Sequence, residues 1–476
     1  MIINVSKEKI KDKSSNISPV FEDTSIEVYI DSSQVEKLCV YRKGDEHLIF
    51  VGRIDNKHNL SYVFNLHDLN DAQFLFELIT HTGVDKAIPL VEGVYLIMYI
   101  VGNQFKILTD PLGQYPFYYH LDKNSFFIAF SRTRNLPLDI KQKLIVKAEE
   151  EIFNPSKSID FAPYEHFKRL TSEKIIEFAC NNNGEVIDFI ISHKYKSFFN
   201  QKLQPYTGEN FLFYLEKRVS EIGSQIPKDI VIPLSGGIDS GMVAALFCAQ
   251  GKRVHTYSIG TDFSDEYVES QQTADFLKTN HKTLHIPSNK IFSLVEELIS
   301  FNEIFDALSI EILLPFGLMF DAAQRDGFKS MCTGYGSDLI LGGTLQNTPP
   351  NLIFNSSTEL IKRTFWTNEF SPFYSQNFGI DLYHPFWSNR LIYYGLNIET
   401  DLKNKNGIEK YIFRYQAEKR NLLPKETVWR KKIGIHKGSS IKKLLTETFD
   451  CTDSELPKIL YRFFAKNILE SKSLIN

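Results

Sequence analysis

Residues 235–240, Ser-Gly-Gly-Ile-Asp-Ser, have the types and spacing of a phosphate-binding loop. They follow an apolar run at 231–234 and lead into a helix predicted over 241–250. The two glycines let the backbone approach an anion, and the N–H groups at the start of the helix can point at it. The serine hydroxyls can donate to phosphate oxygens, and the aspartate can bind Mg²⁺. The segment lacks the Gly-Lys-Ser/Thr ending of a Walker loop, so we predict a phosphate cradle of another kind.

A second cluster, residues 332–343, reads Cys-Thr-Gly-Tyr-Gly-Ser-Asp-Leu-Ile-Leu-Gly-Gly and follows a strand predicted over 330–333. Its glycines permit a tight backbone and an exposed phenol at Tyr335. Asp338 can supply a second metal carboxylate opposite Asp239. Because both clusters follow strands, we expect them at the same sheet edge. Turn glycines with a surface aspartate are the alternative interpretation.

A third cluster, residues 428–440, is basic and rich in Gly and Ser, with no amphipathic period. Such loops usually are solvated surfaces. Next to a site that must neutralise a triphosphate, this loop, which contains Lys432, is a candidate lid that supplies cations.

Glu369 lies between a predicted helix and the His-Pro-Phe segment at 384–386, and alone it is an ordinary surface glutamate.

The elements that must position these residues change character near residue 200. Before it, short β runs alternate with turns, and one helix is predicted near 68–82. The predicted β runs are 27–30, 38–41, 48–54, 62–66, 94–101, 105–109, 117–120 and 126–130. After it, helices alternate with strands predicted at 230–234, 254–259, 283–286 and 330–333. This predicts an N-terminal α+β layered antiparallel sandwich and a C-terminal α/β domain with a parallel sheet and helical additions from about residue 352. We place the domains at 1–200 and 201–476.

Composition excludes several classes of function. At 476 residues the chain exceeds what one core usually holds. A net charge of −4 gives no electrostatic case for binding nucleic acid or an anionic membrane. The five cysteines are scattered, without CxxC spacing, which favours a reduced, cytoplasmic location. The N-terminus has no signal pattern, and the longest apolar run, 94–101, is too short to span a bilayer.

Taken together, the clusters resemble the asparagine synthetase superfamily, closest to its β-lactam synthetase and carbapenam synthetase branch. Residues 92–95 and 108–119, the latter with Asp-Pro-Leu-Gly and an aromatic end, look like the family's glutaminase-type domain. In the other half, 235–240, 257–260, Glu303 with Asp306, and 333–343 fall in family order. The resemblance implies an ATP pyrophosphatase domain that uses ATP and Mg²⁺. By this resemblance the ATP-binding residues are Ser235, Gly236, Gly237, Asp239, Ser240, Ser258 and Gly334, and the metal ligands are Asp239 and Asp338.

Two departures decide the branch. Glutamine-using relatives need a cysteine directly after the initiator Met, but this chain has Ile2, and its first cysteine is Cys39. We therefore expect the glutaminase-like domain to be catalytically inactive, as in the β-lactam-forming relatives. The second departure is Leu339 after the Asp, where asparagine synthetases usually carry Glu. Three residues match the catalytic pattern of the β-lactam synthetase group in kind and order: Tyr335, Glu369 and Lys432.

This resemblance implies that a substrate carboxylate is adenylated and then attacked by an amine. Tyr335, polarised by Glu369, is the candidate base, and Lys432 would stabilise the tetrahedral oxyanion and the leaving AMP. The favoured prediction is a synthetase that closes a β-lactam on a small amino acid. The alternatives are a related amide-forming ligase, such as a lasso-peptide cyclase or an ammonia-dependent enzyme, and a homologue that only binds nucleotide. Homo-oligomers are compatible with the sequence.

Overall fold

The structure is a computed structural model, and it divides the chain into two compact units: Met1–Ser197 with Arg462–Asn476, and Phe198–Tyr461. The boundary expected near residue 200 falls among residues 194–206, outside the described part. The described residues from 462 to 470, which the sequence places in the second domain, group with the first unit. The described residues are 2–5, 17–22, 26–31, 38–121, 127–133, 136, 141–154, 157–181, 185–193, 207–345, 348–431 and 433–470.

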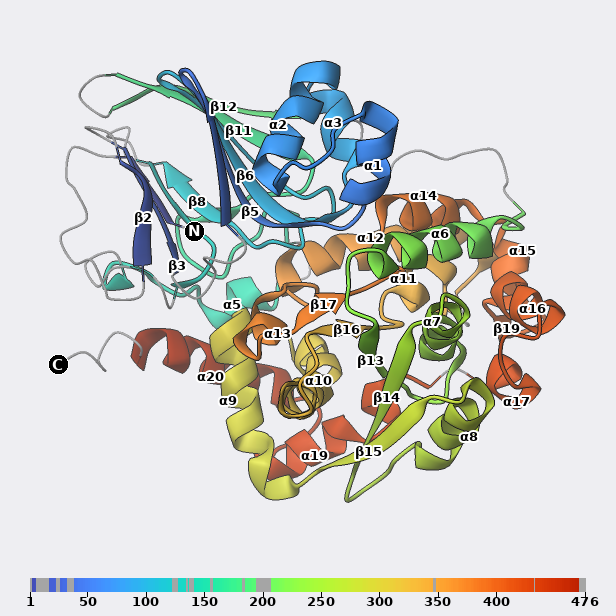
Figure 1. Cartoon of the computed structure of the whole chain (residues 1–476). Coiled ribbons are helices and arrows are strands. Elements are labelled where there is room, and N and C mark those ends of the chain that lie inside the picture. The colour runs from blue at the N-terminus through green and yellow to red at the C-terminus, as the bar shows by residue number, and fades with distance from the viewer. Residues whose placement is uncertain are drawn as a thin grey trace. The chain divides into compact units, whose positions relative to one another are not determined.

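The first unit contains two antiparallel sheets (Figure 1). The first has the strand order β10-β8-β9-β1-β3-β2 and the second has β12-β11-β7-β6-β5-β4. Phe127 of the first sheet lies 4.9 Å from Phe178 of the second, ring centre to ring centre, so the sheets pack face to face. The elements are β1 (Ile2–Val5), β2 (Ile17–Glu22), β3 (Ile26–Asp31), β4 (Leu38–Lys43), β5 (Glu46–Ile54), α1 (Lys57–Phe64), α2 (Asp71–Thr82), α3 (Val84–Leu90), β6 (Gly93–Val101), β7 (Gln104–Thr109), β8 (Tyr118–Leu121), β9 (Phe127–Phe130), α5 (Glu149–Ile152), β10 (Lys168–Arg169), β11 (Lys174–Cys180) and β12 (Val186–His193).

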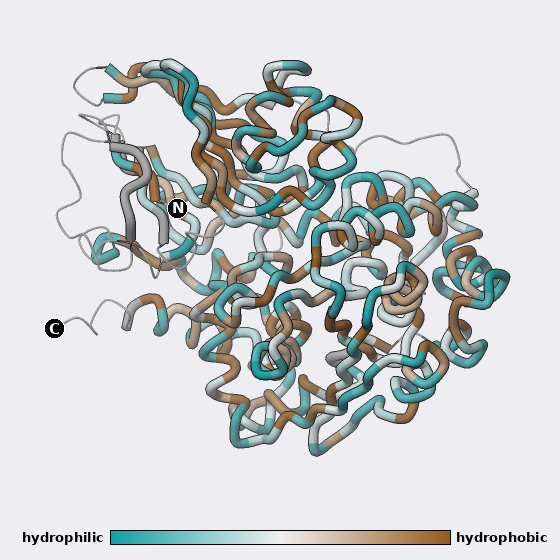
Figure 2. Tube along the Cα trace, in the orientation of Figure 1, coloured by the Kyte–Doolittle hydropathy of each residue, from teal (hydrophilic) through white to brown (hydrophobic). Residues whose placement is uncertain are grey.

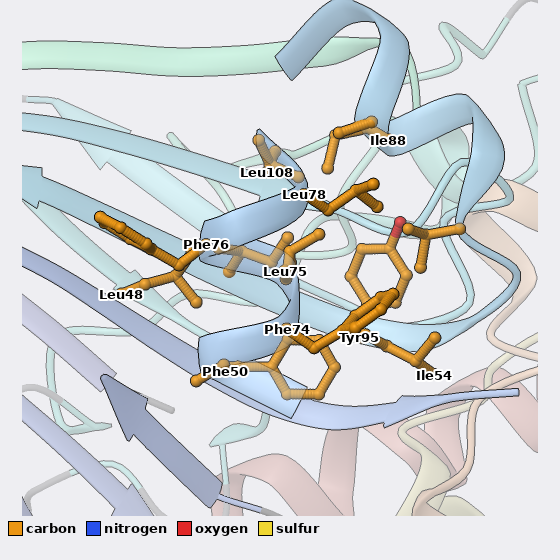
Figure 3. Close-up of a cluster of buried hydrophobic side chains, with 14 of the residues drawn as sticks. Leu48, Phe50, Ile54, Phe74, Leu75, Phe76, Leu78, Ile88, Tyr95 and Leu108 are labelled. Carbon is orange, nitrogen blue, oxygen red and sulfur yellow. The ribbon is translucent and has the colours of Figure 1, made fainter. Parts of the chain in front are cut away.

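Helix α2 covers the other face of the second sheet. It begins at Asn70, whose side chain accepts a hydrogen bond from the Gln73 N–H at 2.9 Å. Its apolar residues Phe74, Leu75 and Leu78 are fully buried against side chains of β5 and β6 (Figure 3). The strands of this sheet are largely hydrophobic along their length (Figure 2). The α+β layering expected for this half is therefore present.

One predicted strand is wrong. Residues 62–66 were expected to be extended, but α1 occupies Lys57–Phe64 and ends at Asn65 in the left-handed conformation. Leu60 and Phe64, four residues apart, both pack on the α2 core, which is the spacing of one helix face. Tyr62 and Val63 point to solvent and are 68% and 73% exposed. The aromatic and β-branched residues of this short run are typical of a strand. The segment is nevertheless helical, because a helix lets Leu60 and Phe64 be buried on the same face.

The second unit is built on a five-stranded parallel sheet of order β15-β14-β13-β16-β17. Helices α7 and α8 pack on this sheet, and α10 packs against β15 (Figure 1). The short strand β17, next to β16, was not predicted. The elements are α6 (Phe211–Gly223), β13 (Asp229–Pro233), α7 (Ile238–Ala249), β14 (Arg253–Thr261), α8 (Tyr267–Leu277), β15 (Asn280–Ile286), η4 (Ser288–Lys290), α9 (Ile291–Asn302), α10 (Ala307–Arg325), β16 (Ser330–Cys332), α11 (Ser337–Leu341), α12 (Pro350–Thr367), α13 (Phe373–Asn377), β17 (Asp381–Tyr383), α14 (Asn389–Asn397), α15 (Thr400–Lys403), β18 (Asn404–Lys405), β19 (Ile408–Glu409), α16 (Tyr411–Lys419), α17 (Lys425–Trp429), α18 (Ile435–Gly438) and α19 (Ile441–Thr448). The last helix, α20 (Leu456–Glu470), begins in this unit, and its residues from Arg462 onward belong to the first unit.

Helix α10 is the one helix in the described part of the chain that is long and apolar enough to cross a membrane. However, 72% of its apolar window is buried inside the protein, as in an ordinary core helix. Its length and composition are therefore weak evidence for a membrane span.

Candidate functional site

The predicted phosphate loop connects β13 to α7. Gly236 has φ +66°, in the left-handed region that glycine tolerates, and Gly237 lies at the N-cap of α7. The Ser240 hydroxyl accepts a hydrogen bond from the Ser235 N–H at 3.3 Å and lies 3.3 Å from the Ser235 hydroxyl. Asp239 lies in the first turn of α7. The loop thus sets two hydroxyls, a carboxylate and the N-terminus of a helix at the end of one strand, which can bind phosphate groups.

The second predicted cluster meets the first. It follows β16, which neighbours β13 in the sheet. A Cβ on Gly334 would lie 2.4 Å from the Ser240 backbone nitrogen and 2.6 Å from the Asp239 carbonyl carbon. The absence of a side chain at Gly334 therefore lets the two loops touch. Both clusters lie at the carboxyl edge of the sheet, where open α/β sheets bind ligands.

The two predicted metal ligands converge on the ammonium of Lys410. Its Nζ lies 2.7 Å from Oδ1 and 2.6 Å from Oδ2 of Asp239, and 2.6 Å from Oδ1 of Asp338. The ammonium also donates to the Ser337 hydroxyl at 3.1 Å. Lys410 is fully buried. The sequence predicted that the two carboxylates oppose each other, and it missed the lysine between them.

The carboxylate pair fits Mg²⁺ of the kind that enzymes bind together with a nucleotide. Such a metal uses one or two protein carboxylates and takes its remaining ligands from phosphates and water. The described residues contain no group of three or more His, Cys, Asp or Glu side chains that could hold a metal by itself. Asp239 and Asp338 are thus the residues that would hold Mg²⁺. The ammonium group of Lys410 lies between their carboxylates.

Gly343 makes room for this arrangement. A Cβ at Gly343 would lie 2.1 Å from Oδ1 of Asp338 and 2.4 Å from Cε of Lys410. Contacts this short force a displacement, so a side chain here would move either the carboxylate or the ammonium. The glycine at the end of the second cluster therefore serves the ion pairs.

Tyr335 and Glu369, which the resemblance implies act together, form a hydrogen-bonded pair. The phenol donates to the Glu369 carboxylate, and burial together with that negative charge raises the pKa of Tyr335 well above its usual value. Burial also raises the pKa of Glu369. Tyr335 immediately follows Gly334, so the pair lies directly beside the phosphate loop. At neutral pH the phenol is protonated and can pass a proton to the carboxylate.

A second group of side chains fixes Glu369. The Ser309 hydroxyl, in the first turn of α10, lies 2.9 Å from a Glu369 carboxylate oxygen and 2.8 Å from one of the N-cap Asp306, and its single hydrogen can be donated to either. Arg363, on α12, is paired with Asp306. Burial raises the pKa of Glu369, the positive charge of Arg363 lowers it and the negative charge of Asp306 raises it, and the pKa is raised on balance.

Aromatic rings support the tyrosine. Phe370 stacks on Tyr335 at 4.8 Å between ring centres, and Trp387 stacks on Phe370 at 4.0 Å. His384 meets both Tyr335 and Phe370 edge-on, and its Nδ1 lies 2.7 Å from the Thr333 hydroxyl. The phenol is therefore held in one position rather than free to rotate with the loop.

The basic segment lies against the phosphate loop. Arg430 donates to the Ser235 carbonyl oxygen at 3.2 Å and pairs with Glu266 at 3.0 Å and Glu269 at 3.2 Å, both at α8. The Ser439 carbonyl accepts a hydrogen bond from the Thr261 hydroxyl at 2.7 Å. Lys432 lies outside the described residues, so its role stays a prediction. Its neighbours on both sides are nevertheless anchored to the loop and to β14.

Ser258 lies in β14 and is buried, with 1% of its surface exposed. Its hydroxyl is 3.3 Å from Nε2 of His281 in β15, whose Nδ1 lies 2.9 Å from the Thr256 hydroxyl. Burial lowers the pKa of His281, which keeps the ring neutral. Ser258 thus has a structural partner, and its predicted contact with ATP remains a prediction.

Comparison with known proteins places the chain in a family. The sequence profile described as asparagine synthase matches residues 228–368 and 373–472, just over half of the chain. The chain belongs to the asparagine synthase family. The matched residues include the phosphate loop, Tyr335 and Lys410. Glu369 lies in the short gap between the two matched parts.

Within the asparagine synthase family, the chain is similar to carboxyethyl-arginine beta-lactam-synthase of Streptomyces clavuligerus, with 33% identity over 225 residues. That match covers 47% of this chain and 43% of the relative, less than half of its length. The glutamine-hydrolyzing asparagine synthetase of Gallus gallus is 23% identical over 425 residues, covering 83% of this chain and 73% of the relative. A solved structure of the allosteric regulatory enzyme of purine biosynthesis covers 47% of each chain at 14% identity, with a TM-score of 0.23 that supports no argument.

The sequence pattern alone does not indicate three of the residues at the site. Lys410 and Arg363 both lie in the region from about residue 352 that the sequence predicts to be mostly helical. Neither residue type has a local pattern that distinguishes a buried ion-pair partner from a surface charge. Arg430 lay within the predicted basic cluster, but its carboxylate partners on α8 come from elsewhere in the sequence. Only the fold brings these residues together.

Proposed function

We propose that this protein is an ATP-dependent synthetase that adenylates the carboxylate of a small amino acid and closes an intramolecular amide, a β-lactam, with release of AMP and pyrophosphate. The observation that carries the proposal is the hydrogen-bonded Tyr335–Glu369 pair beside the phosphate loop. A proton acceptor at this place suits a reaction in which an amine must lose a proton. The 33% identity to a β-lactam synthase supports this branch.

In the first step a substrate carboxylate oxygen attacks the α-phosphorus of ATP, and the bond to pyrophosphate breaks. The approach of two anions requires positive charge and N–H donors. The N-terminus of α7 and the hydroxyls of Ser235 and Ser240 bind the phosphate groups. Mg²⁺ held by Asp239 and Asp338 would offset the phosphate charge.

In the second step the substrate's amine nitrogen attacks the acyl carbon, and the bond from that carbon to the AMP oxygen breaks. An aliphatic amine is mostly protonated at neutral pH and is unreactive in that form. The ammonium first loses one proton to solvent. As the free amine attacks, its second proton passes to the Tyr335 oxygen while Tyr335 passes its own proton to Glu369. The raised pKa of Glu369 makes this carboxylate a better final acceptor. Lys432 is proposed to stabilise the oxyanion.

The first unit is proposed to be an inactive glutaminase-like scaffold. Ile2, at the start of β1, is 1% exposed and offers no nucleophile. The amine would then come from the substrate itself. Holding the amine and the activated carboxylate in one bound molecule removes much of the entropic barrier to ring closure.

A related amide-forming ligase is the second candidate. The asparagine synthetase of Gallus gallus matches 83% of this chain, a larger share than the β-lactam synthase does. A lasso-peptide cyclase or an ammonia-dependent enzyme would share the first step and differ in the source of the amine.

The test separates the two steps. We would offer a panel of β-amino acids with ATP, and measure ATP–pyrophosphate exchange and product mass. Tyr335→Phe and Glu369→Gln should retain most of the exchange and lose product formation by about 10²–10⁴-fold, the usual contribution of a general base. The product should be the substrate less one water. Added nitrogen in the product, or normal product formation by both variants, would reject the β-lactam reading in favour of the second candidate.

A further inference from the structure

The ammonium of Lys410 stands where the two metal-binding carboxylates converge. It contacts both oxygens of Asp239 and one oxygen of Asp338 at 2.6 to 2.7 Å. These three oxygens are the donors that a divalent cation would use. A metal ion at the same point would meet a positive charge at contact distance, which is strongly unfavourable in a buried site.

The rest of the fold holds Lys410 in this position. It precedes α16 with φ +55°, a left-handed conformation that is uncommon for lysine. Its neighbour Glu409 is paired with Arg414 at 2.6 Å, and the Arg414 Nε also donates to the Glu409 carbonyl at 2.7 Å. The antiparallel strands β18 and β19 lead directly into this turn. The side chain is thus presented from a fixed backbone rather than from a mobile surface.

Charge explains why a lysine can be buried here. A fully buried ammonium is stable only with anionic or hydrogen-bonding partners, and Lys410 has two carboxylates and a hydroxyl. Equally, two carboxylates directed at one point repel each other unless a cation lies between them. Lys410 therefore supplies the positive charge that keeps the carboxylates of Asp239 and Asp338 close together.

We propose that Lys410 is an internal counter-cation that competes with Mg²⁺, so that the enzyme binds the metal only together with a nucleotide. Free Mg²⁺ would have to displace the ammonium from both carboxylates and leave it without an anionic partner. A nucleotide brings phosphate oxygens that can accept the ammonium, which removes this penalty. The inference rests on the proposed function in taking Asp239 and Asp338 as the metal-binding pair.

Metal binding by variants of Lys410 distinguishes this role from a simple structural ion pair. The wild-type protein should bind a divalent cation weakly alone and tightly with a non-hydrolysable ATP analogue. Lys410→Met should bind the cation at least about tenfold more tightly than wild type without nucleotide, because two unpaired carboxylates then face each other. Adding Asp338→Asn to that variant should abolish the tight binding.

The experiment uses Mn²⁺ as the probe, with the free ion measured by electron paramagnetic resonance in the absence of any substrate. Lys403→Met is the matched control. Lys403 is also buried, but its ammonium donates to the Leu396 carbonyl, and burial lowers its pKa to about 7. This control should bind Mn²⁺ as weakly as wild type. If Lys410→Met does not fold, Lys410→Gln, which removes the charge and keeps a polar side chain, takes its place in the same titration.

Tight stoichiometric Mn²⁺ binding by wild type without nucleotide would overturn the inference, as would equal binding by wild type and Lys410→Met. Loss of nucleotide affinity in Lys410→Met with unchanged Mn²⁺ binding would make the lysine a phosphate ligand instead, and would also overturn it. The proposed function is tested separately, by measuring ATP–pyrophosphate exchange in the wild-type protein. Normal exchange together with failed metal competition would reject only the role of Lys410.

Discussion

Replacing Gly334 with alanine tests whether the contact between the two loops is needed for both chemical steps. The added methyl would lie 2.4 Å from the Ser240 nitrogen, 2.6 Å from the Asp239 carbonyl carbon and 2.8 Å from the Ser240 Cα. Non-bonded heavy atoms are most favourable at about 3.5–4.0 Å, so the loops must separate by about 1 Å. All three contacts are with backbone, which cannot move aside as a side-chain end can. We expect a stability loss of about 1–3 kcal/mol, typical of overpacking.

The chemical loss should be larger than the stability loss. A displacement of about 1 Å in a catalytic arrangement can lower a rate by about 10²-fold. Because Gly334 adjoins Tyr335 on one side and touches the Asp239 backbone on the other, Gly334→Ala should reduce pyrophosphate exchange and product formation together. This differs from Tyr335→Phe, which should affect the second step alone.

The assay compares both activities per folded molecule, with the folded fraction taken from thermal unfolding. Gly317→Ala is the matched control, since a Cβ at this position in α10 would lie 1.9 Å from the Tyr374 hydroxyl and strain the same unit elsewhere. The control should lose stability and keep its activity per folded molecule. Wild-type exchange in Gly334→Ala, or a loss no greater than its unfolded fraction explains, would refute the argument.

Three further predictions follow from charge and chemistry. Glutamine should release no glutamate above background, because Ile2 cannot act as a nucleophile; glutamate release by the purified protein would contradict this. Lys432→Met should keep pyrophosphate exchange and lose product by about 10²–10³-fold, as expected for one oxyanion donor; unchanged product formation would remove Lys432 from the mechanism. Burial raises the pKa of Glu311 from 4.5 to about 7, so the folded protein binds this proton more tightly than the unfolded chain, and stability falls as the pH rises through that range. Glu311→Gln should therefore raise the melting temperature by about 2–4 °C above pH 7, after allowance for partial solvent screening, and leave it unchanged in acid; equal melting curves at both pH values would contradict this.

The sequence predicted the parts of the site that depend on local pattern. The phosphate loop and the Gly334–Asp338 segment each follow a buried strand, and strands of a parallel sheet end at one edge. Their contact in the structure therefore follows from topology. The pairing of Tyr335 with Glu369 came from resemblance, because no local feature of residues 367–371 indicates where the carboxylate points.

The sequence could not predict what depends on long-range packing. Lys410 lies 171 residues from Asp239 in the chain, and its own segment reads as an ordinary amphipathic helix. The same limit applies to the first unit, where residues 62–66 have strand-like composition and Leu60 with Phe64 bury a helix face. In both cases the tertiary partner decides the outcome, and a single sequence does not name that partner.

Asn302 and Asn368 exchange side-chain hydrogen bonds that fix the start of the Glu369 segment. The Asn368 amide donates to the Asn302 carbonyl at 3.1 Å, and the Asn302 amide donates to the Asn368 carbonyl at 3.5 Å. Glu369 is therefore held from the end of α9 as well as from α12, whose Arg363 is paired with Asp306. Two helices that are distant in the chain thus place one carboxylate, and designs that vary substrate preference should leave both asparagines unchanged.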